Sequence, residues 1–396
     1  MGGFKLKLKL EIEKMSNFFG LGIVQTFNLL AAYFGWSFFT VYFYELGYSI
    51  SEMIFSGIFY SLTPIIVILF SKRISSRTAM NIGILFRALA IFFCYKFIFN
   101  YLGHTQLFLV NSLIGLMSVY YWLSNYAIIQ KEAKTNNRAF IAMVFSSIDP
   151  LVSMIAPLIS AWIIEKNDYA IMFNVALGFT VFALFSTKLV KKEVILDFNI
   201  KKIMKQLKHL KTLTFIQGVF SGLNTFTIGL ITISFVKSLF DYGVFASMTA
   251  VFGIVASLLL GRWSDKIRNR VVFAKFSLII TGVLTFLSSF STNYTAWIIS
   301  RSFYGFFIGV AFPFVFTIVG DCIENKEDGM VARNLLMNFG AVIGSIISLL
   351  IFYLTNNLMN IVVVSSFMLF LMAFLVQKNS KHYALVLKKP EKEIIK

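Results

Sequence analysis

Apolar residues along this chain gather in long, continuous blocks, and the short segments between the blocks carry most of the charge. A helix needs about 20 mostly apolar residues to cross the ~30 Å hydrocarbon core of a bilayer. The blocks reach that length and are too continuous for the alternating strands of a membrane barrel, so they predict helices. Twelve spans are predicted, near residues 17–46, 51–71, 79–98, 106–130, 138–164, 167–187, 212–237, 243–261, 271–291, 295–320, 331–353 and 358–377.

The composition and the distribution of charge agree with a membrane protein. The chain is 58% hydrophobic and 14% charged, whereas soluble domains are about one quarter charged. The net charge of +18 could indicate nucleic acid, but 30 of the 36 Lys and Arg residues lie in the two tails and the loops on the same side as the tails. The positive-inside rule then places both termini in the cytoplasm, in a multi-pass protein of the cell membrane. We expect this charge to face anionic lipid headgroups, not nucleic acid.

The ends and the cysteines add little chemistry. The opening segment FKLKLKLEIEK alternates with a period of two, and we expect it to lie on the membrane surface or to be an upstream extension, with Met15 as the translation start. The first apolar block is too long for a cleavable signal peptide and lacks a small-residue cleavage site. The two cysteines, Cys94 in a span and Cys322 in a loop, are not placed to form a disulfide.

The longest charged loop, residues 188–211, falls at the middle of the chain and divides it into two bundles. The predicted units are an N-tail (1–16), a six-helix bundle (17–187), this linker (188–211), a second six-helix bundle (212–377) and a C-tail (378–396). Within the linker, apolar residues at helical spacing alternate with lysines, which predicts an interfacial amphipathic helix. A solvated linker is the alternative. The apolar positions are Ile200, Ile203, Met204, Leu207 and Leu210.

Short matches between the two halves indicate an internal duplication. Asn28, Glu45 and Gly47 are matched by Asn224, Asp241 and Gly243 at an offset of 196. The segment NSLIG (111–115) is matched by RSFYG (301–305) at an offset of 190. Parallel repeats of this kind are one recurrent plan of transporters.

The loop LLLGRWSDKIRNR (258–270) resembles the loop signature of the major facilitator superfamily, a Gly, then an Asp followed by a basic cluster. The glycine lets a helix end pack closely, and the aspartate can receive cations or a helix N-terminus and so latch one conformation. The first-half loop FSKRISSR (70–77) has Ser71 and Ser75 in place of the Gly and the Asp. The predicted latch residues are Gly261, Arg262, Asp265 and Lys266.

Two further motifs are similar to patterns of that superfamily. Arg301, Gly305 and Gly309 match its Arg-Gly motif, although they lie in the tenth span rather than the fourth. The stretch APLISA (156–161) is similar to a fifth-span motif of exporters and favours export, with Ala and Ser where Gly is usual. The resemblance implies an all-α integral membrane fold of twelve transmembrane helices in two pseudo-symmetric six-helix bundles.

The resemblance also implies a central cavity lined by spans 1, 4, 7 and 10. The polar residues on those spans are mostly amides and aromatics, which suit a small organic solute. Each of them could instead join helices within a bundle. An arginine at membrane depth is expensive and usually functional, so Arg301 favours a carboxylate or phosphate group on the solute. The candidates are Gln25, Asn28, Tyr33, Trp36, Asn111, Tyr121, Trp122, Asn125, Gln217, Asn224, Thr225, Arg301 and Tyr304.

Asp149 is the only acid deep within a predicted span. Burial moves a carboxyl group toward reversible protonation near neutral pH, so Asp149 is a candidate proton carrier that communicates with Arg301 or Arg87. Two alternatives remain open: a protonated Asp149 could satisfy carbonyl groups freed by Pro150, or the carboxylate could pair with Arg87. Arg87 in the third span has no other explanation at this point.

We therefore expect a secondary active transporter that moves a small organic solute by alternating access, coupled to protons and without a cofactor. An enzyme is disfavoured: the chain lacks a phosphate-binding Gly-x-x-x-x-Gly-Lys loop, and its three histidines and two cysteines are too scattered for a metal site. A non-transporting membrane sensor or subunit is the alternative, favoured by the altered first-half loop. We expect a monomer.

Overall fold

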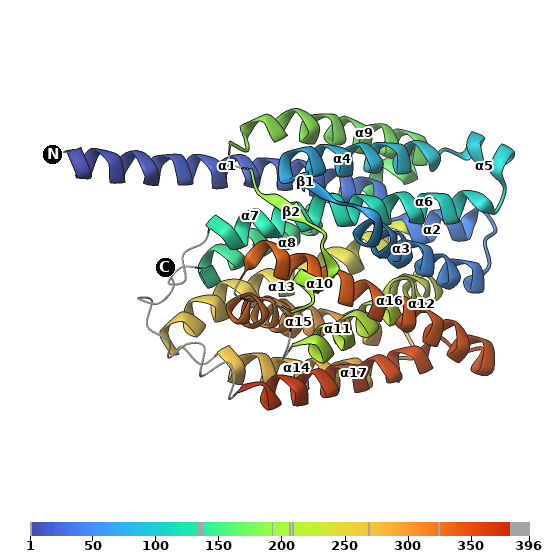
Figure 1. The fold of residues 1–396 in the computed structure, drawn as a ribbon. Coiled ribbons are helices and arrows are strands. Elements are labelled where there is room, and N and C mark those ends of the chain that lie inside the picture. Colours follow the sequence, from blue (N-terminus) through green and yellow to red (C-terminus); the bar gives the residue numbers. More distant parts are fainter. Residues whose placement is uncertain are drawn as a thin grey trace.

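The computed structural model describes residues 2–132, 138–191, 193–205, 207, 210–267, 270–323 and 325–380. Within these ranges, 12 helical segments are long and apolar enough to cross a membrane, which confirms the predicted number of spans. The helices of the first half and those of the second half gather in two neighbouring groups, blue to green and yellow-green to red in Figure 1. The chain is thus all-α, with two six-helix bundles joined by a linker.

The first bundle contains one span that bends and one that carries a π-helical turn. Span 1 consists of two helices, and span 4 contains the π-helix η1 between two α-helices. Ser49 and Asp168 begin two of the spans by capping free N–H groups with their side chains. The elements are α1 (Gly2–Trp36), α2 (Phe39–Glu45), α3 (Ile50–Phe70), β1 (Arg73–Ser75), α4 (Ser76–Phe93), α5 (Lys96–Leu102), α6 (Thr105–Met117), η1 (Ser118–Trp122), α7 (Leu123–Glu132), α8 (Arg138–Lys166) and α9 (Tyr169–Ser186).

The second bundle follows a short linker and repeats the same order of spans. Asn293 and Asn325 cap the helices of spans 10 and 11. The linker elements are η2 (Thr187–Leu189), β2 (Ile195–Asp197) and α10 (Ile200–Ile203). The bundle elements are α11 (Lys211–Asn224), α12 (Thr227–Phe235), α13 (Leu239–Ile267), α14 (Arg270–Ser288), α15 (Tyr294–Cys322), α16 (Lys326–Thr355) and α17 (Met359–Lys378).

Spans 1 and 7 break at matching positions, and the breaks give the register of the repeat. Ser37-Phe38 separates α1 from α2, and Thr225-Phe226 separates α11 from α12, so the breaks lie 188 residues apart (225 minus 37). This offset differs by two residues from the predicted 190 and by eight from 196. Asn28 lies within α1, whereas Asn224 is the last residue of α11. The match of Asn28 with Asn224 was therefore wrong as a structural equivalence.

The opening segment differs from the expectation of a surface-lying stretch. The backbone of residues 2–17 continues α1 as one helix, which projects from the bundle in the direction of the first span (Figure 1). The period-two alternation of FKLKLKLEIEK therefore falls on a helix that does not turn to follow the membrane surface.

The linker forms a strap, defined here as residues 193–204, rather than a long amphipathic helix. Its strand β2 pairs antiparallel with β1, and α10 is a single turn. Ile203 is fully buried, as are Leu207 and Leu210 just after the strap, so these apolar residues pack on the protein and not on lipid. β1 belongs to the first bundle, while β2 and α10 contact α16 of the second. The strap therefore bridges the two bundles at one end, called the linker end below.

Candidate functional site

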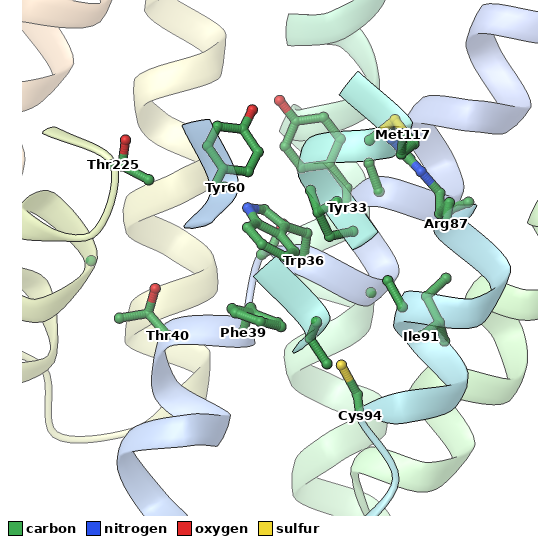
Figure 2. A pocket seen from close by; sticks show the side chains of 18 of the residues that line it. Tyr33, Trp36, Phe39, Thr40, Tyr60, Arg87, Ile91, Cys94, Met117 and Thr225 are labelled. Atoms are coloured by element: carbon green, nitrogen blue, oxygen red, sulfur yellow. Dashed lines mark hydrogen bonds between the residues drawn. The ribbon is translucent and has the colours of Figure 1, made fainter. Parts of the chain in front are cut away.

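Two cavities lie among the spans and share part of their walls. The larger, of about 740 Å³, is lined by residues of both bundles, and the smaller, of about 370 Å³, lies mostly within the first bundle. Figure 2 shows the smaller cavity, with Tyr33, Trp36 and Tyr60 gathered at its centre and Arg87 beside Met117. The residues common to both cavities are Tyr33, Tyr60, Trp122, Asp149 and Ile228.

Asp149 stands at this shared wall and is held by a tyrosine. The hydroxyl of Tyr33 on α1 donates a hydrogen bond of 2.8 Å to Oδ1 of Asp149 on α8. The helix α8 continues unbroken through Pro150 and Pro157. Within the described part of the chain, Asp149 makes no salt bridge with a Lys or Arg. The alternative in which Asp149 pairs with Arg87 therefore loses its support.

Arg301 lies in the larger cavity with its charge facing aromatic rings rather than an acid. Its side chain is 4% exposed, and its guanidinium carbon lies 3.7 Å from the centre of the Tyr304 ring and 5.6 Å from that of Trp297. Cation–π contacts of this kind hold a guanidinium in place without neutralising it. Its Nε and Nη1 atoms are buried without a hydrogen-bond partner, so donors remain for an anionic group.

Arg333 is a second arginine of the larger cavity, and it is not among the site residues predicted from the sequence. It falls at the start of the predicted span 11 (331–353), where a basic residue is usual at the membrane surface, but α16 begins at Lys326 and carries Arg333 inside the bundle, 8% exposed. Its Nη2 donates to Oε1 of Gln217 at 3.3 Å, and its guanidinium lies 5.1 Å from the centre of the Phe316 ring. The signal that locates it is the cap Asn325, whose side chain accepts from the N–H of Asp328.

Arg87 of α4 lines the smaller cavity and is 3% exposed. One of its terminal nitrogens donates to the carbonyl oxygen of Asn28 and the other contacts the sulfur of Met117 at 3.3 Å, while Nε has no partner. No described acid forms a salt bridge with it. The neutral carbonyl and thioether orient the guanidinium and leave its charge uncompensated.

The cavities contain more positive than negative charge. Among the described lining residues, the charged side chains are Arg87, Arg301, Arg333 and one acid, Asp149. Buried charges without partners are costly, and cavities of one sign attract ions of the opposite sign. The arrangement therefore suits a negatively charged solute.

Several of the predicted polar residues do line the cavities. Trp36 and Asn224 line the smaller one, Gln25, Gln217 and Arg301 line the larger one, and Trp122 lines both. Gln25 also connects two helices, because it donates to the carbonyl oxygen of Phe145 at 2.9 Å and accepts from Asn125 at 3.1 Å.

Other predicted residues lie behind the walls. Asn111 donates to Ser56 at 3.1 Å and to the carbonyl oxygen of Leu107 at 3.0 Å, which joins α6 to α3. The ring of Tyr304 packs against the guanidinium group of Arg301. The predicted residues found outside both cavity walls are Asn28, Asn111, Tyr121, Asn125 and Tyr304.

The predicted latch cannot be placed in detail. Gly261, Arg262, Asp265 and Lys266 belong to the last turns of α13, and their side chains lie outside the described residues. The first-half loop, in contrast, is held by the strap: Arg73 pairs with Asp197 at 3.2 Å and Arg77 with Glu193 at 3.2 Å. Within the part of the chain that the structure describes, no group of three or more His, Cys, Asp or Glu could hold a metal ion.

Comparisons with known proteins bear on both the sequence and the fold. Residues 210–394 match the family model of the Major Facilitator Superfamily. No curated protein matches the chain at a significant level. Among solved structures, the human organic anion transporter MFSD10 (TETRAN) is 14% identical, with a TM-score of 0.66 over 92% of this chain and 99% of that one.

Two further structures agree. FucP, a Major Facilitator Superfamily transporter in the outward conformation, is 12% identical, with a TM-score of 0.65 over 93% of this chain and 97% of its own. A POT family transporter in complex with a thioalcohol-conjugated peptide is 11% identical, with a TM-score of 0.68 over 92% and 96%. At these identities the structures show a common fold, the two-bundle fold of transporters.

Proposed function

We propose that this chain, a protein of the Major Facilitator Superfamily, is a secondary transporter that moves a small organic anion across the cell membrane and couples that movement to protons. The superfamily fold supports secondary transport of a solute. The observation that carries the anionic substrate is the excess of buried arginines over acids along the two cavities. The neighbouring fold of MFSD10, described as an organic anion transporter, is consistent with this class.

Asp149 is the proposed proton carrier because it is the one described acid on the cavity walls. It lies at the wall common to both cavities, so its protonation changes the electrostatic potential that a solute experiences in either cavity. Tyr33 can donate to the ionised carboxylate and needs only to rotate its hydroxyl to accept from the protonated form. Both states of Asp149 therefore have a hydrogen bond.

Alternating access requires that the bundles rock against each other along a close interface. Helices α8 and α13 provide one: a Cβ atom at Gly243 would lie 3.0 Å from the carbonyl oxygen of Pro157 and 3.1 Å from Cβ of Ala161. The APLISA stretch thus faces the other bundle, and its likeness to exporters supports export as the proposed direction. We also propose a monomer with both termini in the cytoplasm.

The test is proton movement driven by solute in proteoliposomes with a trapped pH-sensitive dye. Glutarate, lactate and glycerol 3-phosphate are added separately, and uptake of the radiolabelled compound is measured in parallel. We expect wild type to couple at least one of these anions to protons. Asp149→Asn should exchange the labelled anion without moving protons, whereas Glu193→Gln, which changes an exposed acid outside the cavities, should behave as wild type.

The outcomes separate the alternatives. Equal proton coupling in Asp149→Asn and wild type would remove Asp149 from the mechanism. Binding of an anion without any flux would instead favour a non-transporting sensor or subunit.

A further inference from the structure

Three arginines without acid partners are distributed over the two cavities, and their positions suggest more than one anionic contact. Arg301 and Arg333 line the larger cavity, and Arg87 lines the smaller one. We propose that Arg87 forms a second anion subsite and that the transported solute carries two separated anionic groups, one at Arg87 and the other at Arg301 and Arg333. This inference rests on the proposed function and names its substrate class.

The surroundings of Arg87 leave hydrogen-bonding capacity unused. Nε of Arg87 is buried without a hydrogen-bond partner, and the residue is 3% exposed. Its neighbours behind the cavity wall are neutral: the carbonyl oxygen of Asn28 accepts from it, and the Tyr121 hydroxyl lies near its charge. Such an unsatisfied charged group is costly in a span, and an anionic ligand at the cavity side of Arg87 would compensate its charge.

The two subsites are connected rather than separate. Tyr33, Tyr60, Trp122 and Asp149 border both cavities, so a solute that passes this wall reaches both. Trp36 and Tyr60 lie on the smaller cavity and offer apolar ring faces to the carbon skeleton between the anionic groups (Figure 2). A compact monoanion could occupy only one end at a time.

The balance of charge favours two anionic groups. Two charges on the solute and an ionised Asp149 would match the three guanidinium groups. A monoanion would leave at least one buried arginine uncompensated, which is unfavourable at membrane depth. Protonation of Asp149 would remove the one negative charge on the cavity walls and strengthen the hold on the dianion, and loss of that proton would favour its release, which links the second subsite to the proposed coupling.

The test compares dianions with matched monoanions. Binding of α,ω-dicarboxylates of four to eight carbons, and of their monomethyl esters, is measured by calorimetry on the purified full chain in detergent. We expect wild type to bind the best dianion at least about tenfold more tightly than its monoester. Arg87→Gln should lose this preference while its affinity for the monoester changes less than about twofold, and Arg73→Gln at the surface, where the side chain is 73% exposed, should keep the preference.

Each outcome decides between the two proposals. No preference for dianions in wild type, or a preference that survives Arg87→Gln, would overturn the second subsite and leave anion transport standing. Binding of none of the acids or esters by wild type would instead argue against the proposed function itself. If Arg87→Gln does not fold, Arg87→Lys keeps the charge: it should retain most of the preference, and complete loss with normal melting would contradict the inference.

Discussion

Tyr33 and Asp149 connect the first and fifth spans through a hydrogen bond of 2.8 Å at the wall that the two cavities share. The tyrosine comes from α1 and the aspartate from α8, so the bond crosses the first bundle. A proton gained or lost at Asp149 therefore changes a contact between two spans and also the charge beside the solute. This contact makes the proposed coupling open to a direct test.

Replacing Tyr33 with phenylalanine should shift the pH dependence of transport. The substitution removes the donor that stabilises the ionised carboxylate, and a hydrogen bond to a charged group contributes about 1.5–3 kcal/mol. The midpoint of the transport–pH profile should then move to higher pH by roughly one to two units. Solute-driven proton movement, measured from pH 5 to pH 9, checks this.

Tyr60→Phe is the matched control for that experiment, because Tyr60 also borders both cavities but comes from α3. It can change the affinity for solute, but its pH midpoint should equal that of wild type. If Tyr33→Phe also keeps the wild-type midpoint, the bond to Asp149 has no part in coupling.

A carboxylate placed opposite Arg333 should block the larger cavity. Gln217 accepts from Arg333 at 3.3 Å, so Gln217→Glu would replace a neutral acceptor with a charged one. Charge-assisted hydrogen bonds are about twice as strong as neutral ones, and the bound glutamate would compete with a solute. We expect a higher melting temperature without ligand and a loss of glutarate affinity of about tenfold or more.

Asn338→Asp is the corresponding control, since Asn338 lines the same cavity but its amide donates to Asn334. It adds the same charge and should not raise the melting temperature. Unchanged glutarate binding in Gln217→Glu would show that Arg333 does not contact the solute.

The sequence predicted the spans well because hydrophobic length is a local property that a bilayer enforces. It also located Arg301 and Asp149, since a charge inside an apolar block is conspicuous. Arg333 was not among the predicted site residues because it lies at the predicted start of span 11, where a basic residue is usual at the membrane surface. Reading Asn325 as a cap would have placed it about two turns inside the helix.

Tertiary contacts were harder to predict. Amides such as Asn111 and Gln25 look alike in sequence, yet one joins helices behind the wall and the other reaches the cavity. The rotation of each helix about its axis decides between these roles, and a uniformly apolar helix carries little signal of that rotation. The pairing of β1 with β2 joins residues more than 100 positions apart, so no local pattern indicated it.

The strap depends on Lys202, whose ammonium lies 2.9 Å from Asp328 and 3.5 Å from Asp197. The hydrogen bond to Asp328, together with both negative charges, raises the pKa of Lys202 above 10.5, although burial opposes this. Burial would raise the pKa of Asp197, but the N–H of Asn199 and the charges of Arg73 and Lys202 outweigh it and hold that pKa below 3.8.

These shifts fix the pH range in which the strap is stabilised. The contribution of Asp197 is present above its unfolded pKa and is lost as the pH falls through the lower folded value. That of Lys202 is present below its unfolded pKa and is lost as the pH rises through the higher folded value. Between about pH 4 and pH 10, the ion pairs should therefore hold β2 in place.

Lys202→Met should loosen the strap within that range. We expect amide hydrogen exchange in residues 194–198 to accelerate by roughly two- to fivefold at pH 7, an effect of the size typical of ion pairs made by a solvent-exposed lysine. Lys205→Met, at a neighbouring exposed lysine, should leave exchange unchanged. Equal exchange in both variants would mean that the backbone ladder alone holds the strap.

Span 7 packs against span 11 through glycines that leave no room for a side chain. A Cβ atom at Gly222 of α11 would lie 2.1 Å from the carbonyl oxygen of Ala341, and one at Gly344 of α16 would lie 2.2 Å from that of Val219. Small residues that let backbones approach closely are the usual basis of helix packing in membranes. The second bundle is therefore expected to depend on this contact.

Gly222→Ala should destabilise the protein, because the added methyl group meets backbone rather than a movable side chain. Overpacking of this kind costs about 1–3 kcal/mol, which should appear as a lower melting temperature in detergent. Gly178→Ala in α9 is the matched control, since a Cβ atom there meets nothing within 4 Å. Alanine is also the better helix former, so this variant should melt at or above the wild-type temperature. Similar melting of the two variants would show that α11 and α16 can separate without loss, and the close contact would then not explain the stability of the bundle.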